Sequence, residues 1–154
     1  MEKYSIQEVV EQAVQTERLG YDFYTRMSGK FGEDAKLKKL FETLAAKELQ
    51  HEMKFSELKK TVPDNIVDET GEASAFLRAV AESEFFLGKN KSLVSLEHLN
   101  AGADAVRFAI GFERETLLYY YGLKDVLGED AILNEIINEE KSHIRWLAEM
   151  RQSL

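Results

Sequence analysis

Hydrophobic residues recur every three or four positions over most of this chain, which is the spacing of one face of an α-helix. An all-β fold would need many short β-branched runs separated by frequent turn signals, and the sequence lacks them. The pattern therefore predicts an all-α protein.

Capping and breaking residues divide this pattern into four long helices. Ser5 with Glu8 three residues later forms a capping box, and Asp130 is a good N-cap. Pro63 closes the second helix, and Gly122 is expected to end the third. The predicted helices span Ser5 to about Ser28, Asp34 to Thr61, Ser95 or Ala103 to Tyr121, and Asp130 to the C-terminus.

The connection between the second and third of these helices is long. Val62 to Gly71 is expected to form a loop, Ala73 to Leu87 an additional shorter helix, and Gly88 to Ser92 a polar turn. The apolar Phe85–Leu87 cluster is expected to pack this helix onto the bundle or onto a partner subunit. Two helical hairpins joined by one long crossover predict a four-helix bundle, as a single domain over residues 1–154.

The two halves of the chain repeat one pattern. Five residues reappear at a constant offset, with Ala13, Val14, Glu17, Arg18 and Tyr24 corresponding to Ala109, Ile110, Glu113, Arg114 and Tyr120. The second and last helices each carry a Glu-x-x-His sequence, Glu48 to His51 and Glu140 to His143. Residues three apart lie on the same helix face, so each Glu and His can converge on one point.

These repeated polar residues occupy core positions. Glu48 and His51, for example, continue the apolar stripe that runs from Leu44 to Phe55. The complete inward-facing set is Glu17, Glu48, His51, Glu113, Glu140 and His143. Each of the four helices thus directs a carboxylate into the core.

Four ionised carboxylates in one core are prohibitive without compensation, because each buried charge costs several kcal/mol. Protonation of all four would demand large simultaneous pKa shifts. Two divalent cations cancel the four charges, and neutral imidazoles complete the ligand set. Carboxylate and imidazole ligands suit iron or manganese, whereas a structural zinc site is usually a closed cage of four ligands. The sequence predicts a two-metal centre.

Composition excludes several other kinds of protein. The 154 residues carry a net charge of −8, which argues against a nucleic-acid binder. They contain no cysteine, which excludes disulfides, thiolate metal sites and thiol catalysis. The polar start from Met1 to Val10 does not resemble a secretory signal, and no apolar run is long enough to cross a membrane. We therefore expect a cytoplasmic protein.

Several neighbouring residues have simpler interpretations. His98 lacks a glutamate three residues before it and is expected at the surface or in packing. Tyr24 and either Tyr120 or Tyr121 are core aromatics or donors to ligand carboxylates, where a phenol could also supply protons. Three further glutamates are expected on other helix faces, salt-bridged and in solvent: Glu52, Glu115 and Glu139.

The six-residue arrangement resembles the ferritin-like di-iron superfamily, and within it rubrerythrin-type proteins most closely. The local sequences Glu17–Tyr24, Leu44–His51 and Glu139–His143 carry this resemblance. It implies that Glu48 and Glu140 bridge two iron ions, or manganese or mixed metals. It also implies that Glu17 and Glu113 are terminal ligands, and that His51 and His143 each serve one metal.

The resemblance further implies reduction of hydrogen peroxide, or activation of dioxygen, in oxidative-stress defence. Two departures stand out. Rubrerythrins usually carry an extra glutamate where this chain has Thr116, and commonly a cysteine-rich rubredoxin module that relays electrons. A peroxidase would then need an external electron donor protein. The alternatives are a ferroxidase-type iron-handling protein and an interaction bundle that its metal only stabilises. We also expect a homodimer.

Overall fold

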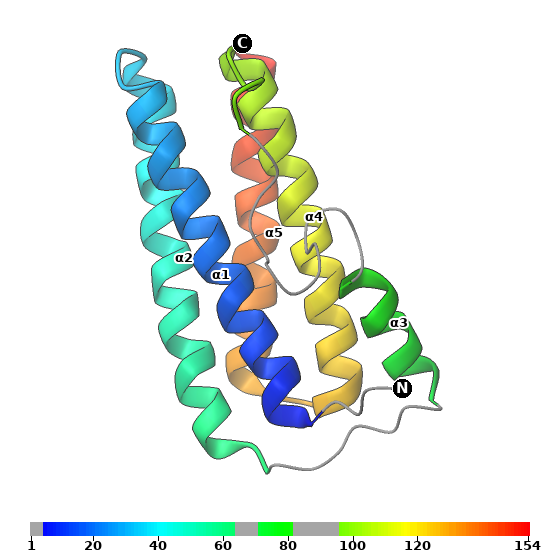
Figure 1. The fold of residues 1–154 in the computed structure, drawn as a ribbon. Helices are drawn as coiled ribbons and strands as arrows, with labels where there is room; N and C mark the ends of the chain where they lie inside the picture. The colour runs from blue at the N-terminus through cyan, green and yellow to red at the C-terminus, as the bar shows by residue number, and fades with distance from the viewer. Residues whose placement is uncertain (1–4, 64–70, 82–95) are drawn as a thin grey trace.

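The computed structural model describes residues 5–63, 71–81 and 96–154, which form five α-helices. The helices are α1 (Ile6–Lys30), α2 (Ala35–Thr61), α3 (Glu72–Ala81), α4 (Gly102–Leu127) and α5 (Ala131–Gln152). α1, α2, α4 and α5 lie side by side as a bundle, and α3 packs against the outside of α4 (Figure 1). The described residues include no strand, so the predicted ferritin-like helical bundle with an extra short helix in its crossover is confirmed.

Three of the predicted helix starts are confirmed by their caps. Ser5 accepts a hydrogen bond from the backbone N–H of Glu8, and the Glu8 side chain accepts one from the backbone N–H of Ser5. Asp34 caps α2, and Asp130 caps α5 by accepting from the backbone N–H of Leu133. These side chains supply partners for amides that lack one inside the helix.

The predicted end of the third long helix is wrong. α4 continues through Gly122 and ends at Gly128, whose φ of 81° lies in the left-handed region that glycine adopts readily. Gly122 instead lets α3 approach α4, because an added Cβ there would lie 3.1 Å from side-chain atoms of Phe76 and Leu77. The start of α4 at Gly102 agrees with the later of the two predicted starts, Ala103.

The additional helix in the crossover is present as α3, ten residues long. Its predicted continuation to Leu87, the Phe85–Leu87 cluster and the Gly88–Ser92 turn lie outside the described residues, as do residues 64–70 of the predicted loop. His98 is exposed, in agreement with its predicted place at the surface.

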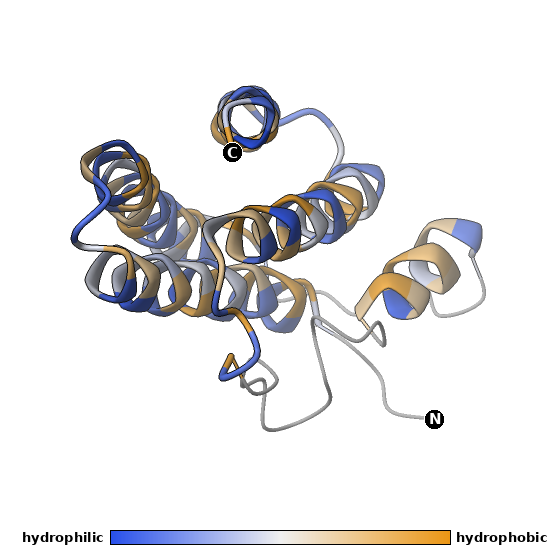
Figure 2. Cartoon of the chain, turned by 90° about the horizontal axis from the view of Figure 1, so that it is seen from above, coloured by the Kyte–Doolittle hydropathy of each residue, from blue (hydrophilic) through white to orange (hydrophobic). Residues whose placement is uncertain are grey.

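The bundle helices are amphipathic, and their apolar faces form two separate clusters. Seen from above in Figure 2, each helix carries both hydrophilic and hydrophobic residues. One cluster includes Val10, Phe55 and Leu133, and the other includes Phe41 and Leu147. The inward-facing carboxylates and imidazoles come from intermediate positions along the same helices, so apolar packing flanks them. No described helix is long and apolar enough to span a bilayer.

Candidate metal centre

The four bundle helices bring all six predicted residues together in the interior. The helix α1 supplies Glu17, α2 supplies Glu48 and His51, α4 supplies Glu113, and α5 supplies Glu140 and His143. None of the six is more than 1% exposed. Such burial of four carboxylates is rare in proteins unless they are paired or bind metal.

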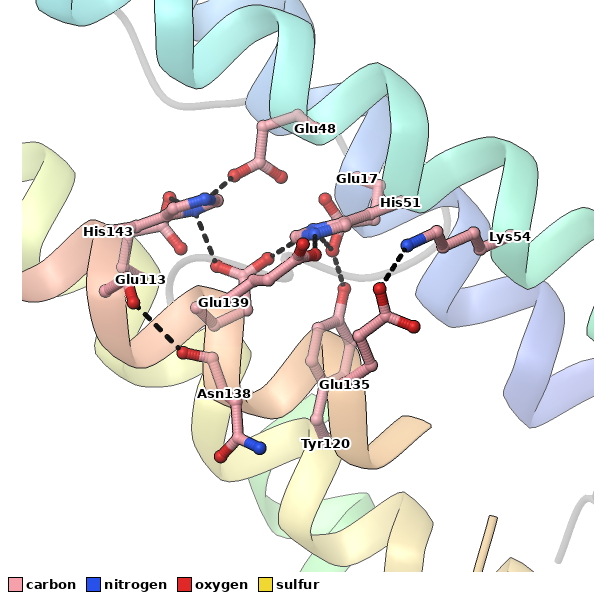
Figure 3. A network of polar contacts seen from close by, with 12 residues as sticks. Glu17, Glu48, His51, Lys54, Glu113, Tyr120, Glu135, Asn138, Glu139 and His143 are labelled. Carbon is pink, nitrogen blue, oxygen red and sulfur yellow. Dashed lines mark hydrogen bonds and ion pairs between the residues drawn. The ribbon is translucent and has the colours of Figure 1, made fainter. Parts of the chain in front are cut away.

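The six side chains form two overlapping groups. In each group, one ligand atom per residue lies within 4.8 Å of the others. One group consists of Glu17, Glu48, His51 and Glu140, and the other of Glu48, Glu113, Glu140 and His143. Because Glu48 and Glu140 belong to both groups, their carboxylates lie where they could bridge two ions. Figure 3 shows this convergence of side chains from opposite helices.

Unpartnered polar atoms within the cluster show that it fits metal ions. One carboxylate oxygen of each glutamate has no hydrogen-bond partner among the residues that the structure describes, and the same holds for both ring nitrogens of His143. An unsatisfied buried polar atom costs about 1–3 kcal/mol, and more when it is charged. Bound cations would satisfy these oxygens and nitrogens together, so the donor set suits two metal ions.

Two tyrosines hold the outer carboxylates in place. Tyr24 on α1 donates a hydrogen bond of 2.6 Å to Oε1 of Glu113 on α4. Tyr120 on α4 donates one of 2.5 Å to Oε1 of Glu17 on α1. Both tyrosines are fully buried, and the two bonds are related by the internal repeat. Each phenol therefore orients a carboxylate of the opposite half of the chain.

Comparison with known protein families identifies the family of this chain. The sequence pattern described as rubrerythrin matches residues 8–151. The chain belongs to the rubrerythrin family.

A solved structure agrees with this membership. A ferritin-like diiron-carboxylate protein from Thermotoga maritima superposes with a TM-score of 0.67 and 25% sequence identity. The alignment covers 99% of this chain and 97% of that protein. No curated protein matches the chain.

Without metal, this rubrerythrin-type site must share protons among its carboxylates. Burial, and then the neighbouring carboxylates, raise the pKa of Glu48 well above its ordinary value and that of Glu113 to about 7. Burial also acts to raise the pKa values of Glu17 and Glu140, but hydrogen bonds from neighbouring groups outweigh it and lower both. Below about pH 7 the carboxyl of Glu113 therefore keeps its proton, and Glu48 holds one in preference to Glu17 and Glu140, the two carboxyls that ionise first.

The histidines balance the two ionised carboxylates. Burial alone would lower the pKa of His51, but Glu17 and Glu140 outweigh it and raise the pKa to about 11. The pKa of His143 rises to about 10 because Glu113 and Glu140 likewise outweigh burial. Two imidazolium cations facing two carboxylates leave the metal-free cluster close to neutral.

Several residues near the cluster lie differently from prediction, among them Tyr121, a candidate core aromatic or donor, and Glu139, expected in solvent. Tyr121 is 37% exposed and lies under the ammonium of Lys141, so it takes no part in the cluster. Glu139 does not face solvent freely: its Oε2 lies 2.5 Å from Nε2 of His51, and its side chain is 29% exposed. Glu52 forms the expected salt bridge, with Arg18, but its side chain is only 14% exposed, and Glu115 is half-buried.

The sequence interpretation missed the role of Gly20. An added Cβ there would lie 2.9 Å from Oε2 of Glu48 and 3.2 Å from the Phe112 ring. The signal was a glycine inside a strongly periodic helix, which often marks close packing. At the repeat-related position, three residues after Glu113, stands Thr116, which is buried. This position therefore carries no glutamate.

Proposed function

We propose that this chain is a non-haem di-iron oxidoreductase that reacts with hydrogen peroxide or dioxygen in a cytoplasmic oxidative-stress defence. The observation that carries the proposal is the pair of overlapping Glu and His groups, which share Glu48 and Glu140. Membership of the rubrerythrin family supports iron as the metal. The similar Thermotoga protein, named for a diiron-carboxylate centre, supports it as well.

Two ferrous ions, when bound, would supply the two electrons that convert one hydrogen peroxide and two protons into two waters. The chain provides the frame for this reaction. Glu17 and His51 would hold one ion and Glu113 and His143 the other, with Glu48 and Glu140 shared between them.

The tyrosines act as fixed donors in this frame. Burial, and then the carboxylates around them, raise the pKa values of Tyr24 and Tyr120 well above 10. Both phenols therefore remain protonated at neutral pH, and each keeps its hydrogen bond to a terminal carboxylate. They hold Glu113 and Glu17 in one orientation while the charge at the centre changes.

The electrons that restore the ferrous state must come from elsewhere. None of the 154 residues is a cysteine, so they contain no rubredoxin-type iron site. We propose a separate donor protein or a small reductant. The side chain of Glu139, which is 29% exposed, contacts the buried His51 and so links the cluster to the protein surface.

The test is anaerobic loading with Fe(II), followed by a single addition of hydrogen peroxide. We expect about two irons per chain and rapid oxidation. The absorption of the oxidised centre, recorded over time, measures the rate of that oxidation. The variant Glu48→Gln is the control, because it changes a residue shared by both groups. Binding far below two irons, or oxidation no faster than in Glu48→Gln, would refute the proposal.

A second measurement distinguishes the enzyme from the alternatives. Repeated turnover with a reductant, while iron stays bound, is expected of a peroxidase or oxidase. Loss or mineralisation of iron after oxidation would instead indicate a ferroxidase-type iron-handling protein. A metallated protein that is inert to both oxidants, but melts at a lower temperature once metal is removed, would indicate a structural metal.

A further inference from the structure

The two histidines of the centre differ in what their outer nitrogens contact. Nδ1 of His51 faces the cluster, 2.9 Å from Oε1 of Glu140, while its Nε2 contacts Oε2 of Glu139 at 2.5 Å (Figure 3). Nδ1 of His143 also faces the cluster, 3.3 Å from Oε2 of Glu140. Its Nε2 is buried and has no hydrogen-bond partner among the described residues. The metal-facing sides are similar, and the outer sides are not.

This difference originates in the sequence repeat. Glu140 and His143 correspond to Glu48 and His51 at a constant offset, so the residue before each ligand glutamate is also related. That residue is Glu139 in α5 and Lys47 in α2. The position beside one ligand pair is therefore acidic, and its counterpart is basic.

A carboxylate on the outer nitrogen changes a histidine ligand in two ways. A ring that binds metal through Nδ1 carries its proton on Nε2, and Glu139 accepts that proton's hydrogen bond and fixes the tautomer and ring orientation of His51. The negative charge also makes the ring a stronger donor and attracts a cation. Loss of such an outer partner typically weakens metal binding 10- to 100-fold.

We propose that Glu139 is a positioning residue that makes the two metal positions unequal, so that the position of His51 binds more tightly and fills first. This inference rests on the metal centre of the proposed function. The position of His143, whose outer nitrogen has no carboxylate partner in the part of the chain that the structure describes, is the weaker one and fills second.

Zn(II) titration of protein labelled with ¹⁵N in its histidine rings tests this proposal without any turnover. The chain has three histidines, and the exposed His98 gives a reference signal. At one Zn(II) per chain we expect the Nδ1 signal of His51 to shift to its metal-bound position before that of His143. The Nε2 proton of His51 is expected far downfield because of its short hydrogen bond to Glu139.

Three variants isolate the contact. Glu139→Ala is expected to lose the order of filling and the downfield proton, with about 10-fold weaker binding at His51. Glu135→Ala, one turn away on the same helix, removes an exposed carboxylate that pairs with Lys54 and is expected to keep both. Lys47→Glu places a carboxylate at the repeat-related position and is expected to strengthen binding at His143.

The outcomes separate this proposal from the metal centre itself. Simultaneous filling of both positions in the unmodified protein would overturn the inference and leave the centre intact. The same follows if Glu139→Ala preserves the order, or if Glu135→Ala abolishes it equally. Failure of both histidines to bind Zn(II) would overturn the metal centre together with the inference.

Discussion

The hydroxyl of Tyr120 on α4 lies 2.5 Å from Oε1 of Glu17 on α1 and donates a hydrogen bond to it. The repeat-related bond from Tyr24 to Glu113 runs in the opposite direction between the same two helices. Since both carboxylates are candidate terminal ligands, the pair of bonds links packing between α1 and α4 directly to the metal site.

Replacing Tyr120 with Phe is expected to weaken metal binding without unfolding the protein. The change removes one hydrogen bond to a buried carboxylate, worth about 1.5–3 kcal/mol, and leaves the aromatic packing in place. We expect metal affinity to fall about 10-fold or more, measured by competition with a chelator of known affinity. Tyr121→Phe, at an exposed ring, is the matched control. Equal affinities in the two variants would contradict a ligand-orienting role.

The isosteric change Glu48→Gln is expected to separate folding from metal binding. Burial and the neighbouring carboxylates favour the protonated form of the Glu48 carboxyl in the metal-free protein, because they raise its pKa well above its ordinary value. A neutral amide of the same shape should therefore leave metal-free stability nearly unchanged, while the rise in Tm on adding metal is lost. Calorimetric melting with and without metal measures both effects.

The control for this change is Glu42→Gln on the same helix, where the carboxylate is exposed and pairs with Lys38. That variant should keep the full rise in Tm with metal. If Glu48→Gln also keeps it, Glu48 cannot be a ligand shared by two ions.

Gly20→Ala is expected to disturb the site through a single methyl group. The new Cβ would lie 2.9 Å from Oε2 of Glu48, so that carboxylate must shift. Alanine favours a helix over glycine by about 1 kcal/mol, so the higher helix propensity alone would stabilise the protein. We expect metal affinity to fall nevertheless, because the Glu48 carboxylate is displaced. Gly29→Ala, in the same helix with nothing within 4 Å, should gain stability and bind metal normally. Isothermal titration with Zn(II) gives the comparison; unaltered binding in Gly20→Ala would mean that Glu48 moves freely.

Metal loading is expected to release protons. In the metal-free protein the histidines are protonated, with pKa values of about 11 for His51 and about 10 for His143. Glu113 retains its carboxyl proton below about pH 7, and burial with the neighbouring carboxylates raises the pKa of Glu48 well above its ordinary value. Two divalent cations displace all of these, so we expect about four protons per chain when two ions bind at mildly acid pH. Titration in a weakly buffered solution with an indicator dye counts them. Release of fewer than about two would show that the metal-free cluster is not neutralised in this way.

Stability should change with pH in opposite directions in the two forms. The folded-state pKa of Glu113 is raised from 4.5 to about 7, so its contribution to metal-free stability is complete below pH 4.5 and is lost as pH rises through about 7. In the metal-loaded form, protons compete less with metal for the ligand side chains as pH rises over the same interval, so the stability of that form increases. The difference in Tm between the two forms should widen from pH 4.5 to about 7. A constant difference would contradict protonation of the free site.

The sequence alone determined the helical fold and the inward-facing set. The three-and-four spacing of apolar residues and the caps at Ser5, Asp34 and Asp130 are local features, because a helix is defined by bonds and side-chain contacts within a few residues. The Glu and His residues were identifiable for the same reason, since their positions on each apolar stripe follow from helical periodicity. Their repetition in both halves of the chain added independent support.

Contacts between helices were decided only by the tertiary structure. Gly122 and Gly128 are both glycines near the end of a periodic stretch, and only the structure shows that α3 packs against the first while the second, with its positive φ, ends α4. Glu139 follows the same rule: periodicity places it beside Glu140 on another face, and the closeness of α2 and α5 turns that face toward His51. Distances between segments far apart in the chain depend on how whole helices pack, and no local pattern encodes them.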